Sequence, residues 1–302
     1  MRVSTMQASD MLMSCLESSY ASYATVAEQE STGYKINSPS DDPSTYLKLQ
    51  SLSSQQTKLT QYQDNITTAE SMLSSSETQF SSMSDVLSEM RSLAVSAGNG
   101  TLSSTDLSSV ATQMSSLVES LVSFCNATDS DGTYLFSGSK STTQSVTTDS
   151  SGNYVYQGND YQTQVSVADG VTVAATDSLS DIFFSSSSSS SGNFLNDITS
   201  MINSLSSSSD VSSVVSNMLD TIDSTATNLS SAISSIGSRT NELDALNSAN
   251  TETLTYSQNL SSELGDMDYA TAAVKSETLM TSIEATEKVI AKVTSLSLFD
   301  EL

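Results

Sequence analysis

The sequence contains no histidine, no tryptophan, and only two prolines and two cysteines in 302 residues. Histidine is the most adaptable general base and the commonest metal ligand, so its absence excludes Ser-His-Asp and Cys-His catalytic sites and every His-ligated metal site. Cys15 and Cys125 lie far apart and form no C-x-x-C pair, so we interpret both as small buried hydrophobic residues. We expect no cofactor, no metal site and no catalytic residue.

Positive charge is also scarce: the sequence contains 10 Lys and Arg residues and 35 Asp and Glu residues, which gives a formal charge of -25. An acidic field repels phosphate backbones and anionic lipids, so we expect no nucleic-acid partner. The sequence has no apolar run long enough to span a bilayer and none behind Met1, so we expect no membrane insertion and no cleaved signal peptide. A hydrophobic fraction of 36% is low for one large core, and it suits elongated helices that bury a single seam.

Both prolines fall in one short stretch, residues 33–43, which predicts a hinge between two helices. Proline lacks an N–H donor, so we expect Pro39 to end the preceding helix and Pro43 to occupy the first turn of the next one. Asp42 then has the position and the carboxylate of an N-cap. The predicted hinge residues are Gly33, Asn37, Pro39, Asp41, Asp42 and Pro43.

Apolar residues at alternating spacings of three and four form a coiled-coil seam near each end of the chain. The N-terminal seam consists of Met6, Met13, Leu16, Tyr20, Tyr23 and Ala27. The C-terminal seam consists of Leu279, Ile283, Ile290, Val293 and Leu296. Neither segment contains a partner for its own seam, so the two terminal helices are predicted to pair with each other or with neighbouring subunits.

Between the ends, a long seam from Leu52 to Ala97 predicts one helix, and a capping box at Ser103 opens a second helix that reaches Phe124. Alternating residues around Asp169-Gly170 predict a β-hairpin. The fold class is therefore mainly α: an elongated antiparallel helical rod with terminal coiled-coil helices and a small β-rich inserted domain. The expected segments are an N-terminal coiled-coil helix 1–36, a first rod half 37–130, a β-rich insert 131–192 that ends in a polyserine loop, returning rod helices 193–264, and a C-terminal coiled-coil helix 265–302.

Arg239 in the returning helix needs an acidic partner, and Ser137 with Lys140 in the insert form a possible catalytic pattern. Arg239 lies on the apolar stripe of the returning helix, and our hypothesis is that it pairs with an acidic side chain of the hinge. Ser137 and Lys140 satisfy the S-x-x-K pattern of one hydrolase class. No K-T-G accompanies them and they lie at a strand end, so we favour a non-enzyme and keep a hydrolase only as an alternative.

Residues 31–43, S-T-G-Y-K-I-N-S-P-S-D-D-P, resemble the signature of the flagellin superfamily, in the form typical of its hook-associated members. Further matching pieces follow in order at 62–66, 97–103, 132–138, 237–241 and 296–302. The resemblance implies a structural protein of the bacterial flagellum, which forms the junction between hook and filament by coiled-coil polymerisation of its terminal helices. A filament flagellin and a soluble coiled-coil scaffold protein remain alternatives.

The resemblance also implies the partners and the location. The partners would be copies of this chain in a ring or helical assembly, the preceding hook-associated protein, flagellin, and an export chaperone with the flagellar type III export apparatus. The location would be the extracellular flagellum.

Overall fold

The computed structural model describes residues 5–99, 102–129, 131–184, 192–205 and 210–299, with the backbone alone for 5–6 and 294–299. The chain forms two compact units. Unit 1 combines residues 1–58 with 252–302, and unit 2 contains residues 59–251. Helices α2 (Pro43–Ala97) and α6 (Val211–Gly265) each contribute to both units.

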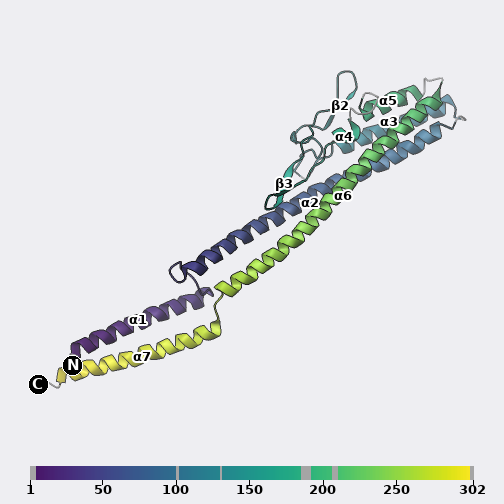
Figure 1. Ribbon diagram of the computed structural model, residues 1–302. Coiled ribbons are helices and arrows are strands. Elements are labelled where there is room, and N and C mark those ends of the chain that lie inside the picture. The colour runs from purple at the N-terminus through teal and green to yellow at the C-terminus, as the bar shows by residue number, and fades with distance from the viewer. Residues whose placement is uncertain (1–4, 100–101, 130, 185–191, 206–209, 300–302) are drawn as a thin grey trace. The chain divides into compact units, whose positions relative to one another are not determined.

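Unit 1 brings the two ends of the chain together. Helix α1 (Thr5–Thr32) packs along α7 (Tyr269–Phe299), as Figure 1 shows. Tyr20 bonds to Glu287, whereas the carbonyl of Gly33 accepts from the N–H of Met267, so the two helices run antiparallel. In the same unit, the side chain of Gln56 near the start of α2 donates to the hydroxyl of Ser257 near the end of α6.

Unit 2 contains the remaining parts of α2 and α6, with α3 (Ser104–Cys125) and α5 (Phe194–Leu205) packed against each other. Gln63 bonds to Thr251 and Arg91 to Asp223, so α2 and α6 are antiparallel here. Every predicted seam residue of α2 from Leu59 to Ala97 is buried except the half-buried Tyr62. The capping box that the sequence predicts at the start of α3 is present.

The β region of unit 2 consists of two separate two-stranded antiparallel sheets. Strands β1 (Val146–Thr148) and β2 (Tyr154–Tyr156) form the first, and β3 (Gln164–Ala168) and β4 (Val171–Ala174) form the second. The turn between β3 and β4 is the predicted one, with Gly170 at a φ of +73°. A short helix, α4 (Ser180–Phe183), follows, and the predicted polyserine loop lies outside the described residues.

Asparagine side chains from the helices and their ends occupy free edges of these small sheets. The amide of Asn126 bonds to both the carbonyl (2.8 Å) and the N–H (2.9 Å) of Val146 in β1. Asn196 of α5 makes the same two bonds to Tyr154 in β2, and Asn250 of α6 donates to a carbonyl of β3. Isolated two-stranded ribbons are marginal in water, so these amides hold the β region on the helices.

One expectation for the local backbone is wrong. Helix α1 ends at Thr32, well before Pro39, because Gly33 adopts a φ of +76° and terminates it.

Candidate functional site

The two terminal helices meet along one stripe of each, which we call the inner seam. Its most buried members are Val26 of α1 (2% exposed) and Ala272 and Ile283 of α7 (5% and 7%). The α1 stripe consists of Leu12, Leu16, Ser19, Tyr23 and Val26. The α7 stripe consists of Ala272, Ser276, Leu279, Ile283, Thr286, Ile290 and Val293. Both follow the alternating spacing of four and three that a coiled coil requires.

The structure places the predicted C-terminal seam on this inner seam, because Leu279, Ile283, Ile290 and Val293 all face α1 at least in part. The side chain of Leu296 lies outside the described residues. The role of these residues in assembly between copies remains a prediction.

The predicted N-terminal seam divides between two faces of α1. Leu16 and Tyr23 belong to the inner seam, and Ala27 is half-buried beside it. Met13 and Tyr20 are 47% and 48% exposed, so they are not buried against α7 of the same chain, and their part in a seam between subunits remains a prediction. The side chain of Met6 lies outside the described residues.

Sequence reasoning missed Leu12, Ser19 and Val26. Their spacing from Leu16 and Tyr23 was a usable signal, but the polar Ser19 interrupts the apolar pattern.

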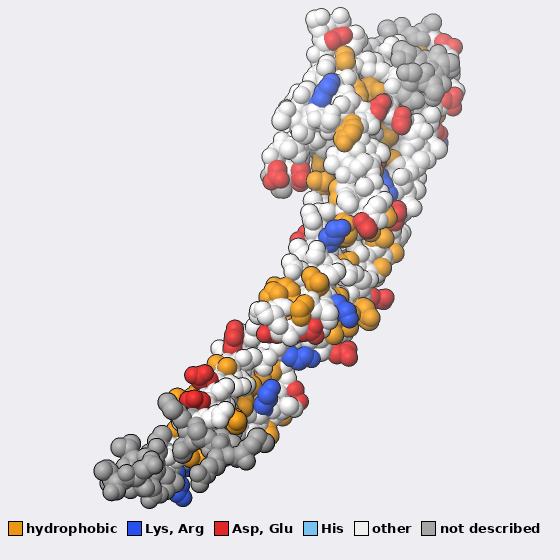
Figure 2. All heavy atoms as spheres, turned by 60° about the vertical axis from the view of Figure 1, so that its left-hand side comes forward, with side chains coloured by type: hydrophobic (Ala, Val, Ile, Leu, Met, Phe, Trp, Pro, Cys, Tyr) orange, Lys and Arg blue, Asp and Glu red, His pale blue; other side chains and the backbone are white. Residues whose placement is uncertain are grey.

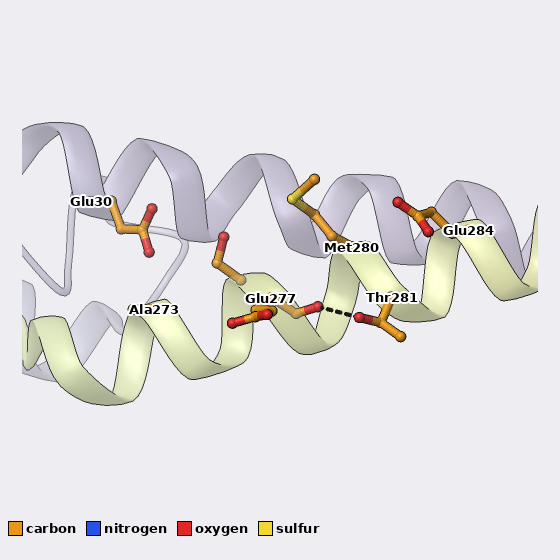
Figure 3. Close-up of a pocket in the computed structure, with 7 residues that line it drawn as sticks. Glu30, Ala273, Glu277, Met280, Thr281 and Glu284 are labelled. Carbon is orange, nitrogen blue, oxygen red and sulfur yellow. Dashed lines mark hydrogen bonds between the residues drawn. The ribbon is translucent and has the colours of Figure 1, made fainter.

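An open groove runs beside the inner seam between α1 and α7 (Figure 3). It is lined by Glu30, Ala273, Ser276, Glu277, Met280, Thr281 and Glu284. Glu30 comes from α1 and the other labelled residues from α7, and Met280 is 48% exposed. Farther along, the hydroxyl of Tyr20 donates to Glu287 at 2.7 Å, and this hydrogen bond raises the pKa of Tyr20. The lining contains three carboxylates and no cation.

The hinge 33–43 is hydrogen-bonded to the second break of the chain, which lies between α6 and α7. The N–H of Lys35 donates to the carbonyl of Gly265 at 2.7 Å, and the N–H of Met267 donates to the carbonyl of Gly33 at 3.0 Å. Tyr34 and Asp266 lie opposite each other in this short antiparallel bridge. The two breaks therefore form one joint.

Inside the hinge, the two aspartates bind backbone. Asp41 accepts the N–H groups of Asn37 (3.1 Å) and Ser38 (2.9 Å). Asp42 caps α2, whose first residue is Pro43, and hydrogen bonds from Thr45 and then Ser44 lower the pKa of Asp42 to about 2.

Two further hinge features complete the local geometry. The hydroxyl of Thr32 donates to the side-chain carbonyl of Asn37, while Pro39 is exposed in the loop. Asp268 gives α7 the same kind of cap, through the N–H of Ala270 and the hydroxyl of Thr271. Sequence reasoning missed this second cap, although an Asp three residues before a Thr at a helix start was a usable signal.

Arg239 does not pair with the hinge, and the hypothesis that it does is wrong. Its guanidinium donates to both carboxylate oxygens of Asp177 (2.7 and 2.6 Å) and to the carbonyl of Ala174 (2.8 Å). The two side chains are only 13% and 11% exposed. Arg239 therefore fastens the segment after β4 to α6 within unit 2.

The residues considered for catalysis are not arranged for it. The hydroxyl of Ser137 donates to the carbonyl of Tyr134, and Lys140 donates to the carbonyl of Gln157, so the two do not form a nucleophile–base pair. Burial raises the pKa of the Cys125 thiol, whereas Cys15 is exposed and the expectation of burial is wrong there.

Over the described ranges, no cluster of three or more Cys, Asp or Glu side chains is arranged to hold a metal. In that same part of the chain, no helix is long and apolar enough to cross a bilayer.

Comparison with known proteins gives consistent matches. The family described as the bacterial flagellin N-terminal helical region matches residues 3–141. The flagellar hook-associated protein 3 of Salmonella typhimurium is 33% identical over 141 residues, which cover 47% of this chain and 44% of that protein. The corresponding Escherichia coli protein is 32% identical over 143 residues, 47% of this chain and 45% of its own length. The matched region thus spans less than half of either curated relative.

A solved structure extends the likeness much further. The structure of a putative flagellar hook-associated protein from Vibrio parahaemolyticus is 35% identical and has a TM-score of 0.69. That match covers 75% of this chain and all of the solved chain.

Proposed function

We propose that this chain is a structural subunit of the bacterial flagellum. It belongs to the flagellin superfamily, and its match to the solved hook-associated protein covers the whole of that solved chain. Its place would be the junction between hook and filament. The observation that carries the proposal is the pairing of the two chain ends, α1 and α7, with apolar side chains still exposed on both helices. Such a pair offers a prefolded surface for polymerisation.

The assembly would proceed through these terminal helices. Copies of this chain would form a ring or a short helical layer, which binds the preceding hook-associated protein on one side and flagellin on the other. An export chaperone and the type III export apparatus would deliver the subunit without a cleaved signal peptide. A charge of -25 supports this route, since mutual repulsion keeps free subunits soluble and separate before capture.

Filament flagellin is the second candidate, because the matching family description refers to flagellins. Gold-labelled antibodies against this chain distinguish the two. Label confined to the base of the filament supports the junction, whereas label along the whole filament contradicts it.

A double variant, Ile283→Asp/Ile290→Asp, tests the role of the terminal helices. Ile283 is 7% exposed in the inner seam, and charge placed there is desolvated without a partner, so we expect α1 and α7 to separate. In a strain that lacks its own junction protein, wild-type chain should restore motility, and the variant should leave cells non-motile with filaments shed into the medium. Unit 2 should keep its own unfolding transition.

The control is Val95→Asp, which introduces one aspartate in place of a 52% exposed β-branched residue in unit 2. It should restore motility as the wild type does. A double variant that still holds filaments on the hook would contradict assembly through the inner seam.

A further inference from the structure

Glu70 of α2 has a carboxylate that unit 2 partly buries. The residue is half-buried, and one of its two carboxylate oxygens, Oε1, is shielded from solvent and accepts no hydrogen bond from any described residue. Buried carboxylate oxygens in folded proteins are usually hydrogen-bonded or paired with a cation. An ionised carboxylate without such a partner loses hydration without replacement, so its ionised form destabilises the folded chain.

The helix opposite Glu70 places a second carboxylate near it. In unit 2 the side chain of Gln63 on α2 bonds to Thr251 on the antiparallel α6. Glu70 lies one heptad after Gln63. Asp244 lies one heptad before Thr251, so the antiparallel register brings it level with Glu70 across the contact of the two helices. The contact between α2 and α6 therefore has two acids at the same level.

The described elements around these two acids supply no free counter-charge. Between Lys58 and Arg91, α2 contains no lysine or arginine, and residues 164–184 of the β region contain none either. Arg239 is the only Lys or Arg of α6, and it donates to both carboxylate oxygens of Asp177. The wider surface is similar, because Figure 2 shows acidic side chains spread over the visible face with fewer Lys and Arg among them.

Other acids also lie on the elements packed at this level. Asn65 of α2 and Asn250 of α6 bond to carbonyls of β3, so the β region adjoins both helices here. The acids that flank the pair are Asp64 and Glu77 on α2 and Glu242 and Glu252 on α6, with Asp169, Asp177 and Asp181 in the β region. Burial raises the pKa of Glu70, and the negative charge of Asp244 raises it further.

We propose that Glu70 is a proton-sensitive point of the helical rod, at which ionisation weakens the contact between α2 and α6 and protonation strengthens it. A protonated carboxyl has no charge that must be desolvated or that repels Asp244, and its O–H can donate a hydrogen bond. At this point the rod is held more tightly in mildly acidic surroundings than at neutral pH. The property belongs to unit 2 alone and does not depend on the proposed function.

The direction of the pH dependence follows from the raised pKa of Glu70. The stability that protonated Glu70 contributes is fully present below pH 4.5, the ordinary pKa of a glutamate, and is lost as pH rises through the raised pKa of the folded chain. Glutamine is the uncharged counterpart of protonated glutamate, so Glu70→Gln should avoid this loss at every pH. The difference in stability between the variant and the wild type should therefore be largest at neutral pH.

Urea unfolding of the full-length chain at two pH values tests the proposal. At about pH 7.5, Glu70→Gln should raise the urea midpoint of unit 2 by at least about 0.3 M, and at about pH 4.5 by less than about half as much. The matched control is Glu77→Gln, the same substitution at an exposed glutamate one heptad farther along α2. In about 0.15 M salt this control should shift the midpoint by less than about 0.1 M at both pH values, because exposed charges are screened.

Asp244→Asn tests the other member of the pair. Removing that charge should also raise the urea midpoint at about pH 7.5. The gain in the double variant Glu70→Gln/Asp244→Asn should be smaller than the sum of the two single gains, because the repulsion can be removed only once. Single gains that add fully in the double variant would overturn the pairing of Glu70 with Asp244.

A direct measurement of proton binding does not depend on unfolding. The side-chain carboxyl resonances of Glu70 and Glu77 in NMR spectra of the wild type can be assigned by their loss from the two single variants. Glu70 should titrate at a higher pH than the exposed Glu77. The proposal would be overturned if both titrated together, if Glu70→Gln were no more stable than Glu77→Gln at about pH 7.5, or if its gain did not shrink at about pH 4.5.

Discussion

Replacing Arg239 with methionine removes the guanidinium that joins α6 to the segment after β4. The methionine fills a similar space along the apolar stripe, so the main loss is charge and three hydrogen bonds, to Asp177 and Ala174. Asp177 would remain 11% exposed without a counter-charge. Removing one partner of a buried ion pair costs about 3–5 kcal/mol, so we expect unit 2 to lose that much stability.

The structure supplies a matched control for this prediction. Arg91 of α2 and Asp223 of α6 form an ion pair of similar length, 2.7 Å, but their side chains are 52% and 50% exposed. Exposed pairs contribute about 0–1 kcal/mol, so Arg91→Met should change little. The contrast between the two variants isolates the effect of burial.

Urea unfolding followed by far-UV circular dichroism measures both variants against the wild type. A loss of several kcal/mol in Arg239→Met beside a loss below about 1 kcal/mol in Arg91→Met is the expected result. The double variant Arg239→Met/Asp177→Leu should recover most of the loss, because no unpaired charge remains. Equal, small losses in the two single variants would refute the argument that Arg239 fastens the β region.

The hinge gives two more predictions. Gly33→Ala should lower the free energy of unfolding by about 1–2 kcal/mol, because φ is +76° at this position and the new Cβ would lie 3.0 Å from the Tyr269 hydroxyl. The control Gly237→Ala should raise it by about 0.5–1 kcal/mol, because the new methyl group meets open space within α6. Equal shifts of the melting temperature in the two variants would contradict this prediction. The pKa of Asp42 is lowered from 3.8 to about 2, so its capping is complete above pH 3.8 and is lost as pH falls toward 2. As the pH falls from 3.8 toward 2, hydrogen exchange at the Ser44 and Thr45 amides of the wild type should accelerate relative to the intrinsic exchange rate. The Asp42→Asn variant should show no such acceleration. The same pH profile in both proteins would contradict the role of Asp42 as a cap.

Much of the fold follows from local patterns. The buried stripe of α2 is apolar at helical spacing without an internal glycine or proline, so its helix and its buried face are both readable. Asp42 and Pro43 predict a helix start, and Asp169-Gly170 predicts a hairpin, because each depends on the conformation of only a few neighbouring residues. The same locality explains one error: Gly33 and Pro39 can each end a helix, and the chain meets the glycine first.

The candidate site was only partly predictable. Leu16 and Tyr23 fit two heptad stripes, one with Met13 and Tyr20 and the other with Ser19 and Val26. Both stripes keep the spacing of three and four, so spacing cannot choose between them. The more apolar stripe contains Met13 and Tyr20, but α7 packs against the other.

The sequence by itself determined that the chain ends are helices with apolar stripes, that a proline hinge follows the first, and that the whole resembles the flagellin superfamily. Only the tertiary structure decided which stripe faces α7, and therefore which side chains remain for another subunit. It also assigned Arg239 to Asp177, 62 residues away, instead of to the hinge. The physical reason is the same in both cases: a local pattern specifies the conformation of its own segment, whereas a partner distant in sequence is specified only by packing.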